Sequence, residues 1–183
     1  MIAGTIFNEE LDLFRKAVRD FFAKEIIPHH DQWEEQGHIS REAWLKTGEQ
    51  GFLLTEVPEE FGGAGVDFRY SAILMEELAH SGCSGPGFAL HSDIVAPYIM
   101  HQANDEQKKR WLPKMASGEL ISAIAMTEPG TGSDLQAVTT SAKKDGDDYL
   151  INGSKTFITN GYMCDLVIVV VKTGDNEISL IMV

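Results

Sequence analysis

The sequence predicts an α+β fold, with an amino-terminal all-α helical bundle followed by an incomplete antiparallel β domain. Two observations lead to this fold class. Before Leu120, apolar residues recur at helical steps of three and four between capping residues, whereas after Gly118 β-branched and aromatic runs alternate with Asp-Gly and Asn-Gly pairs. We therefore expect residues 1–120 to form an α-helical domain and residues 121–183 to form part of a β domain.

Caps and apolar periodicity define the expected helices. Asn8 is the expected cap of the first helix, and Pro28 ends that helix because proline cannot continue the backbone hydrogen bonds. Residues 88–101, "FALHSDIVAPYIMH", are apolar nearly all round and predict a buried helix. Further helices are expected after Ser40, after Asp67 and after Asn104.

Five β-type runs follow: "VTTSAKK", "DYLI", "KTFIT", "LVIVVV" and "ISLIMV". Asn152-Gly153 predicts a hairpin turn, since a type I′ turn needs two residues that tolerate positive φ. On a strand, Phe157 and Thr159 would share one face, where they can flank a planar ring or pack on a helix. The last run ends at Val183 without a turn or a partner, so we expect an amino-terminal piece of a longer protein.

Composition excludes several classes of function. A formal net charge of −13 opposes binding to nucleic acid. We find no targeting segment and no apolar run long enough to span a membrane. The six histidines and two cysteines show no metal-ligand spacing, so no metal site is expected. His91 is interpreted as a hydrogen-bonded core histidine.

The loop "AMTEPGTGSD", residues 125–134, is the strongest candidate for a binding site. Pro129, Gly130 and Gly132 force a turn whose backbone N–H groups can bind an anion, and Ser133 adds a hydroxyl donor. The loop contains no lysine and does not fit the P-loop pattern. An ordinary connection, with Asp134 capping a turn, is an equal alternative at this point.

The stretch "AMTEPGTGSDLQA" resembles the first signature of the acyl-CoA dehydrogenase family. "PEEFGGAG", "NDEQKKRWLPKMASGE" and "YLINGSKTFITNG" occur in the family's order and at its spacings, so the resemblance covers nearly the whole chain. It is greatest to the long-chain branch. The resemblance implies an amino-terminal helical domain, a middle β domain and a carboxy-terminal four-helix bundle, and we expect the last to be absent from these residues.

The resemblance also implies an FAD site. Its cofactor-binding residues would be Ile124, Ala125, Met126, Thr127, Gly132, Ser133, Phe157, Ile158 and Thr159. Ser133 would in addition lie near the substrate. Many relatives have Trp where this chain has Phe157. Residues 88–100 would help to line the tunnel for the acyl chain.

The activity implied by the resemblance is oxidation of a fatty acyl-CoA thioester to the trans-2-enoyl-CoA. The family's catalytic base is a Glu of the carboxy-terminal domain, expected after Val183, so no catalytic residue is assigned here. Glu128 is interpreted as a carboxylate that orients the loop. Two alternatives stay open: an acyl-CoA oxidase-like flavoenzyme, and a truncated module without activity of its own.

The implied partners are a fatty acyl-CoA and an electron-transferring flavoprotein as electron acceptor. The full-length protein is expected to be a homo-oligomer, a tetramer. The expected location is the cytoplasm in a bacterium, or the mitochondrial matrix in a eukaryote. Chain-length preference stays open, because the floor of an acyl tunnel depends on packing.

Overall fold

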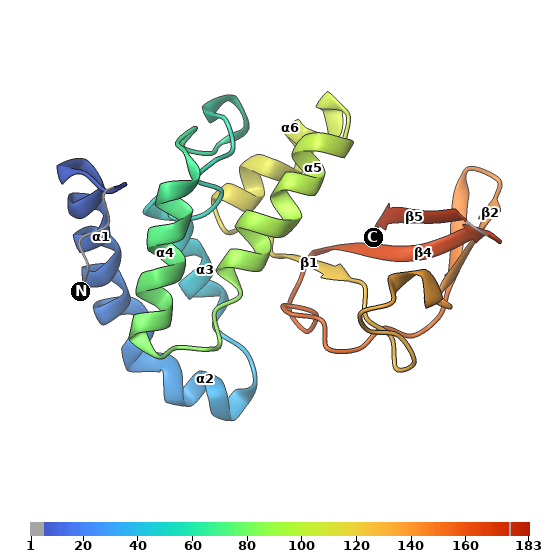
Figure 1. Cartoon of the computed structure of the whole chain (residues 1–183), viewed down its shortest axis with the longest axis horizontal. Coiled ribbons are helices and arrows are strands. Elements are labelled where there is room, and N and C mark those ends of the chain that lie inside the picture. The colour runs from blue at the N-terminus through green and yellow to red at the C-terminus, as the bar shows by residue number, and fades with distance from the viewer. Residues whose placement is uncertain (1–5, 176) are drawn as a thin grey trace. The chain divides into compact units, whose positions relative to one another are not determined.

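The structure is a computed structural model that describes residues 6–175 and 177–183. The chain divides into two compact units, Met1–Leu120 and Ile121–Val183. The first unit is helical and the second contains a sheet (Figure 1). The helix-then-sheet order of the predicted fold class is confirmed. Among the described residues, no helix has the length and apolar character needed to cross a membrane.

The helical unit follows the predicted caps. Asn8 Oδ1 accepts a hydrogen bond from Leu11 N at 3.0 Å, and the side chains of Asn104 and Gln107 form the expected capping box. The α-helices are α1 (Glu9–Phe21), α2 (His30–Gln36), α3 (Arg41–Glu49), α4 (Phe68–Ser81), α5 (Ala96–Gln102) and α6 (Asp105–Ala116). Shorter turns are η1 (Phe22–Ile26), η2 (Ile27–His29), η3 (Glu59–Phe61) and η4 (Leu90–Val95). The sequence pattern missed α2.

Two of these turns, η1 and η4, are π-helical, and each is followed by a proline. In η4, Ala96 N–H donates to His91 O, five residues back instead of four. Pro97 has no N–H to pair with the carbonyl of Asp93, so the α-helical pattern cannot continue through this point. Pro28 follows η1 in the same way and likewise has no N–H to continue the α-helical pattern. The extra residue in each π turn changes the direction of the side chains before the proline.

The core of the helical unit is built around Trp44. Its ring makes edge contacts with Phe88 at 4.8 Å and with His91 at 5.1 Å between ring centroids. His91 is 0% exposed, and its Nε2 lies 3.0 Å from Met115 O. The interpretation of His91 as a hydrogen-bonded core histidine is therefore confirmed.

Burial of His91 makes stability depend on pH. Desolvation lowers the pKa of His91 to about 4, although the bond to Met115 opposes the shift. A histidine with a lowered pKa stabilises the fold above its unfolded pKa of about 6.5, and this contribution is lost as the pH falls towards about 4. We expect the urea concentration at the unfolding midpoint of the helical unit to decrease as the pH is lowered from the first of these values to the second. His91→Gln should lose that part of the pH dependence, whereas the exposed control His80→Gln should keep it; equal profiles for both variants would contradict the assignment.

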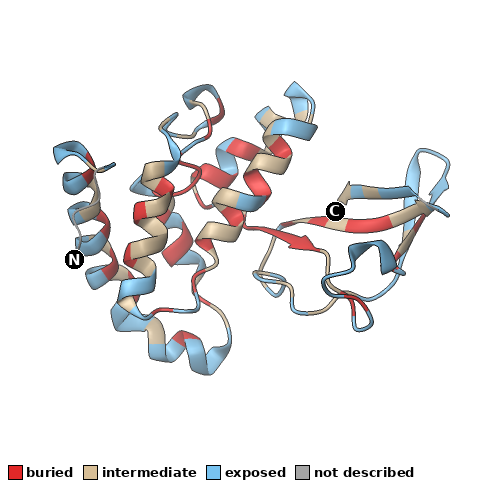
Figure 2. Ribbon diagram, in the orientation of Figure 1, coloured by how far each residue is buried: buried red, intermediate tan, exposed pale blue. Residues whose placement is uncertain are grey.

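The second unit contains a five-stranded mixed sheet with the order β1-β4-β2-β3 and with β5 paired to β4. The strands are β1 (Ser122–Ala125), β2 (Ser141–Asp145), β3 (Asp148–Asn152), β4 (Leu166–Gly174) and β5 (Glu177–Met182). A short turn, η5 (Leu135–Ala137), precedes β2. Figure 2 shows that buried residues concentrate in β1 and β4. The expected antiparallel β domain needs one correction: its sheet is mixed, because β4 pairs in parallel with both β1 and β2.

The hairpin lies at a different place from the one predicted. β2 and β3 are joined by Gly146 and Asp147, whereas Asn152-Gly153 makes no turn between strands. A Cβ at Gly153 would lie 2.3 Å from Thr140 Oγ1, so this glycine permits a close approach of two chain segments. The run "KTFIT" is not a strand either: residues 153–164 form an irregular loop. Phe157 and Thr159 therefore do not share a strand face.

Candidate functional site

The candidate loop begins where the buried strand β1 ends. β1 pairs in parallel with β4, with Ala125 opposite Val169, and all four of its residues are buried. Ile124 and Ala125 are thus core residues, while Met126 and Thr127 are half-buried at the start of the loop. The carboxyl end of a buried parallel strand is a common place for a ligand, because the sheet holds the loop in position.

The turn itself is closed by its own backbone. Glu128 N–H donates to Thr131 O at 2.9 Å, and Thr131 N–H donates to Glu128 O at 3.0 Å. Thr131 Oγ1 donates to Ala137 O at 3.0 Å, and Asp134 caps η5 as the ordinary-connection alternative expected. The loop is therefore rigidly shaped by bonds on its inner side.

The outer side of the turn carries donors without acceptors. Within the part of the chain that the structure describes, the N–H groups of Gly130, Gly132 and Ser133 have no acceptor. The Ser133 hydroxyl has no hydrogen-bond acceptor there either. A Cβ placed at Gly130 or Gly132 would meet nothing within 4 Å, so the space beside them is open. Adjacent N–H groups without acceptors, here those of Gly132 and Ser133, suit a phosphate.

Glu128 is the buried anchor of the loop. It is 4% exposed, and its carboxylate accepts bonds from Thr139 N at 2.7 Å and Thr140 N at 2.9 Å. Thr139 Oγ1 and Lys155 Nζ also donate to it, at 2.6 and 2.9 Å. Burial by itself would raise the pKa of Glu128, but the bonds from Thr139 and Thr140 outweigh burial and hold this pKa well below its usual range. An ionised carboxylate with four donors is a poor proton acceptor, which agrees with a loop-orienting role.

A second loop, residues 153–164, is bonded to the first. Thr156 N donates to Thr127 O at 3.0 Å, and Lys155 Nζ donates to Met126 O at 3.0 Å as well as to Glu128. Asn160 Nδ2 donates to Ser122 O at 3.1 Å. These bonds bring Phe157 next to the start of the candidate loop. Lys155 and Asn160 were missed by the sequence analysis, although both belong to the stretch "SKTFITNG".

Phe157 has an unusual backbone and an exposed ring. Its φ is +55°, a conformation that is rare for a bulky residue, and its side chain is 92% exposed. Both features cost free energy in the isolated chain, and strained residues cluster at binding sites. Ile158 is half-buried and Thr159 is exposed. The structure thus groups Thr127 with the segment containing Phe157, while no hydrogen bond joins Ser133 to that segment within the described residues.

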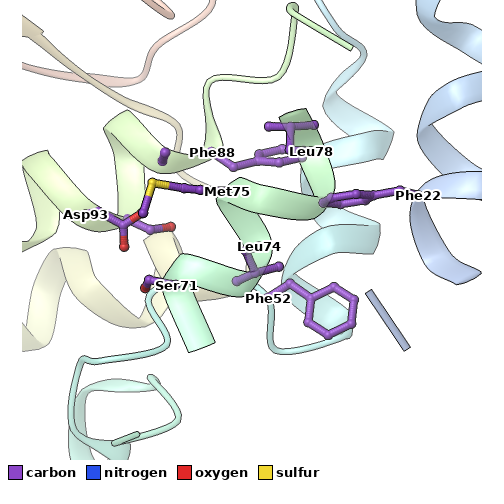
Figure 3. A pocket seen from close by; sticks show the side chains of 10 residues that line it. Phe22, Phe52, Ser71, Leu74, Met75, Leu78, Phe88 and Asp93 are labelled. Carbon is purple, nitrogen blue, oxygen red and sulfur yellow. The ribbon is translucent and has the colours of Figure 1, made fainter. Parts of the chain in front are cut away.

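A pocket lies inside the helical unit (Figure 3). Four of its lining residues come from the segment 88–100 that was expected to line an acyl tunnel: Phe88, Ala89, Ser92 and Asp93. The other lining residues are Phe22, Phe52, Ser71, Leu74, Met75 and Leu78. The wall is mostly apolar, but the cavity volume of about 20 Å³ leaves room for only about one water molecule.

Comparison with known proteins covers both units. The family model of the acyl-CoA dehydrogenase N-terminal domain matches residues 8–119, and that of the acyl-CoA dehydrogenase middle domain matches residues 123–183. The mitochondrial long-chain specific acyl-CoA dehydrogenase of Sus scrofa is 56% identical over 169 residues, which are 92% of this chain and 39% of that protein. The chain therefore spans about two fifths of the length of this curated relative.

Solved structures give the same picture. The crystal structure of an acyl-CoA dehydrogenase from Geobacillus kaustophilus has a TM-score of 0.95 at 50% identity and covers 99% of this chain and 49% of that one. An acyl-CoA dehydrogenase from Bacillus anthracis complexed with FAD has a TM-score of 0.86 at 34% identity, covering 97% of this chain and 32% of that one. The fold is shared with these proteins.

Proposed function

The chain belongs to the acyl-CoA dehydrogenase family, and from this premise we propose that the protein is an FAD-dependent enzyme that oxidises a fatty acyl-CoA thioester to the trans-2-enoyl-CoA. Residues 1–120 would be its helical domain and residues 121–183 part of its middle β domain. The observation that carries the proposal is the loop from Met126 to Ser133. The N–H groups of Gly132 and Ser133 have no acceptor among the described residues, and the start of the loop is bonded to the segment that contains the exposed ring of Phe157.

The residues of the two loops fit a flavin dinucleotide. The N–H groups of Gly132 and Ser133, with the Ser133 hydroxyl, would bind the pyrophosphate. The exposed ring of Phe157 would pack on the isoalloxazine, whose edge Thr127 and Thr159 would bond. The remaining contacts would come from Ile124, Ala125, Met126 and Ile158. FAD, when bound, supplies the acceptor for the hydride that leaves Cβ of the substrate.

Proton removal from Cα needs a carboxylate base that accepts a proton readily. Glu128 does not meet this requirement, because four donors already stabilise its ionised form. We therefore propose that the base is a Glu outside these 183 residues. The part played by this chain would be to hold the cofactor and, through Ser133, the thioester arm of the substrate.

The segment 88–100 would help to line the tunnel for the acyl tail, because its mostly apolar side chains favour hydrocarbon. We further propose an electron-transferring flavoprotein as the acceptor of electrons and a tetramer as the assembly. The expected location is the bacterial cytoplasm or the mitochondrial matrix.

The test is anaerobic reduction of the flavin in the full-length protein. Addition of a saturated fatty acyl-CoA should bleach the flavin absorbance and yield the 2-enoyl-CoA, with little peroxide when air is admitted in the presence of an electron-transferring flavoprotein. A protein that carries flavin but is not bleached by any straight-chain acyl-CoA would contradict the proposed reaction. Rapid stoichiometric peroxide formation would instead favour an oxidase.

The role of Phe157 can be tested by cofactor binding alone. Phe157→Ala removes the ring proposed to pack on the isoalloxazine, so we expect the Kd for FAD to rise about tenfold. Tyr162→Ala is the matched control, because Tyr162 is 86% exposed and lies in the same loop. The measurement is quenching of FAD fluorescence on titration of the apoprotein. An equal loss of affinity in both variants would show that the loop, and not the ring of Phe157, carries the effect.

A further inference from the structure

The arc of residues 156–159 in the second loop carries the exposed ring of Phe157 but does not fix it by itself. Among the described residues, no hydrogen bond reaches the backbone of Phe157, and its side chain is 92% exposed. Its φ of +55° is unfavourable for a bulky side chain, because Cβ then approaches the following carbonyl oxygen. The residues on either side of the arc must therefore impose the position of this ring.

On one side of the arc, Lys155 binds the first loop. Its side chain is 10% exposed, and its Nζ donates to Glu128 Oε1 at 2.9 Å and to Met126 O at 3.0 Å. A buried ammonium group is costly unless it is paired and hydrogen-bonded, and these two acceptors meet that need. The next residue adds one backbone bond, from Thr156 N to Thr127 O at 3.0 Å. Lys155 thus makes two of these three bonds to the first loop.

On the other side of the arc, Asn160 provides an anchor that does not involve Lys155. Its Nδ2 donates to Ser122 O at the start of β1, at 3.1 Å. Its backbone oxygen accepts bonds from Met163 N at 3.0 Å and from Cys164 N at 2.9 Å. This anchor should remain when Lys155 is replaced, so the arc would be released on one side only.

The turn of the first loop needs Lys155 less than the arc does. Without the lysine, the Glu128 carboxylate keeps three donors: Thr139 N, Thr139 Oγ1 and Thr140 N. The two bonds between Glu128 and Thr131 that close the turn are backbone bonds. Loss of Lys155 should therefore loosen the ring half of the candidate site and leave the phosphate-binding turn in place.

We propose that Lys155 is a positioning residue for the cofactor: its ammonium group holds the ring of Phe157 where the isoalloxazine would pack. The inference rests on the proposed function and adds a residue that acts on the flavin through another side chain. With Lys155 replaced, the arc can return Phe157 to a negative φ, which redirects the ring. The ring then packs on the flavin only after the arc is ordered again, and this ordering lowers the affinity.

The test is a double-mutant cycle on FAD binding by the full-length apoprotein. Quenching of FAD fluorescence gives the Kd for wild type, Lys155→Met, Phe157→Ala and the double variant. We expect Lys155→Met to raise the Kd about tenfold. The double variant should bind no more than about twofold more weakly than Phe157→Ala alone, because Lys155 acts through that ring. Lys143→Met, which removes an exposed lysine of β2, is the matched control and should keep the wild-type Kd.

Additive effects would overturn the proposal. They would raise the Kd of the double variant about a hundredfold and indicate a structural role that is independent of Phe157. An unchanged Kd in Lys155→Met would overturn it as well. Lys155→Arg should bind FAD more tightly than Lys155→Met, since it keeps a charged donor. If Lys155→Met does not fold, Glu128→Gln/Lys155→Met replaces it in the cycle, with Glu128→Gln as its reference, because this pair leaves no unpaired buried charge.

The result of this cycle is separate from the test of the proposed reaction, because no acyl-CoA takes part in it. A flavin-loaded wild type that no acyl-CoA reduces would contradict the proposed function, while the cycle would still decide the role of Lys155. Additive effects in a flavoprotein that an acyl-CoA does reduce would contradict the role of Lys155 alone.

Discussion

Replacement of Glu128 by alanine is expected to lower the free energy of unfolding by about 3–5 kcal/mol, the range for loss of one partner from a buried ion pair. The variant leaves Lys155 Nζ, which is part of a side chain only 10% exposed, without its carboxylate. It also leaves the N–H groups of Thr139 and Thr140 without acceptors. Denaturant unfolding followed by circular dichroism gives the free energy. Hydrogen exchange of peptides from residues 126–140 and 153–160 should accelerate most, because Glu128 joins these two segments.

Glu128→Gln is the control that separates positioning from catalysis. The amide keeps the size of the side chain and one acceptor oxygen, so we expect about half of the stability loss. In the fraction of this variant that retains flavin, the rate of flavin reduction by an acyl-CoA should stay within about tenfold of the wild-type rate. Removal of a general base would instead lower this rate by a factor of about 10²–10⁴. A stable, flavin-loaded variant with the larger loss would reassign Glu128 as the base.

The parts of the fold that depend on neighbouring residues are predictable from the sequence. The cap at Asn8 and the capping box at Asn104 require only side chains within four residues of the helix start, and both form as expected. His91 was interpreted correctly for a similar reason, since a histidine in an apolar helix has few polar groups other than a backbone carbonyl to bond. These features follow from short-range rules.

The parallel sheet was not predictable in this way. The partner of Ile124 on β1 is Ile168 on β4, and nothing near either residue in the sequence specifies their pairing. The runs on both strands are apolar without strict alternation, which agrees with buried parallel strands but does not identify their neighbours. The hairpin turn predicted at Asn152-Gly153 was wrong for a different reason: Gly153 is needed for its close approach to Thr140, not for a turn.

The candidate site likewise combines features that follow from neighbouring residues with features that depend on residues far apart in the sequence. The turn from Glu128 to Ser133 was located from its glycines and proline, and the loop-orienting role of Glu128 was expected from its place in the turn. The donors that explain this role, Thr139 and Lys155, lie 11 and 27 residues further along the chain. Sequence spacing does not reveal that Lys155 returns to Glu128, so the stretch containing Phe157 was read as a strand instead of a loop fixed by a buried lysine.

Replacement of Gly118 by alanine is the second change with a large expected effect, a loss of at least about 3 kcal/mol of unfolding free energy in the helical unit. Gly118 has a φ of +77°, and a Cβ there would lie 2.2 Å from the backbone oxygen of Trp44. The alanine variant must therefore accommodate both left-handed backbone strain and a clash that no side-chain rotation relieves. Intrinsic fluorescence of Trp33, Trp44 and Trp111, which all lie in the helical unit, follows its urea unfolding and gives the free energy.

Gly37→Ala separates the two contributions to this loss. Gly37 has nearly the same φ, +81°, but a Cβ there would meet nothing within 4 Å. Its replacement should cost only the backbone strain, about 1 kcal/mol. The difference between the two variants then measures the contact of Gly118 with Trp44, the point at which the end of α6 packs against α3. Equal losses would mean that the chain relaxes around the new methyl group, and that this packing is looser than the 2.2 Å approach requires.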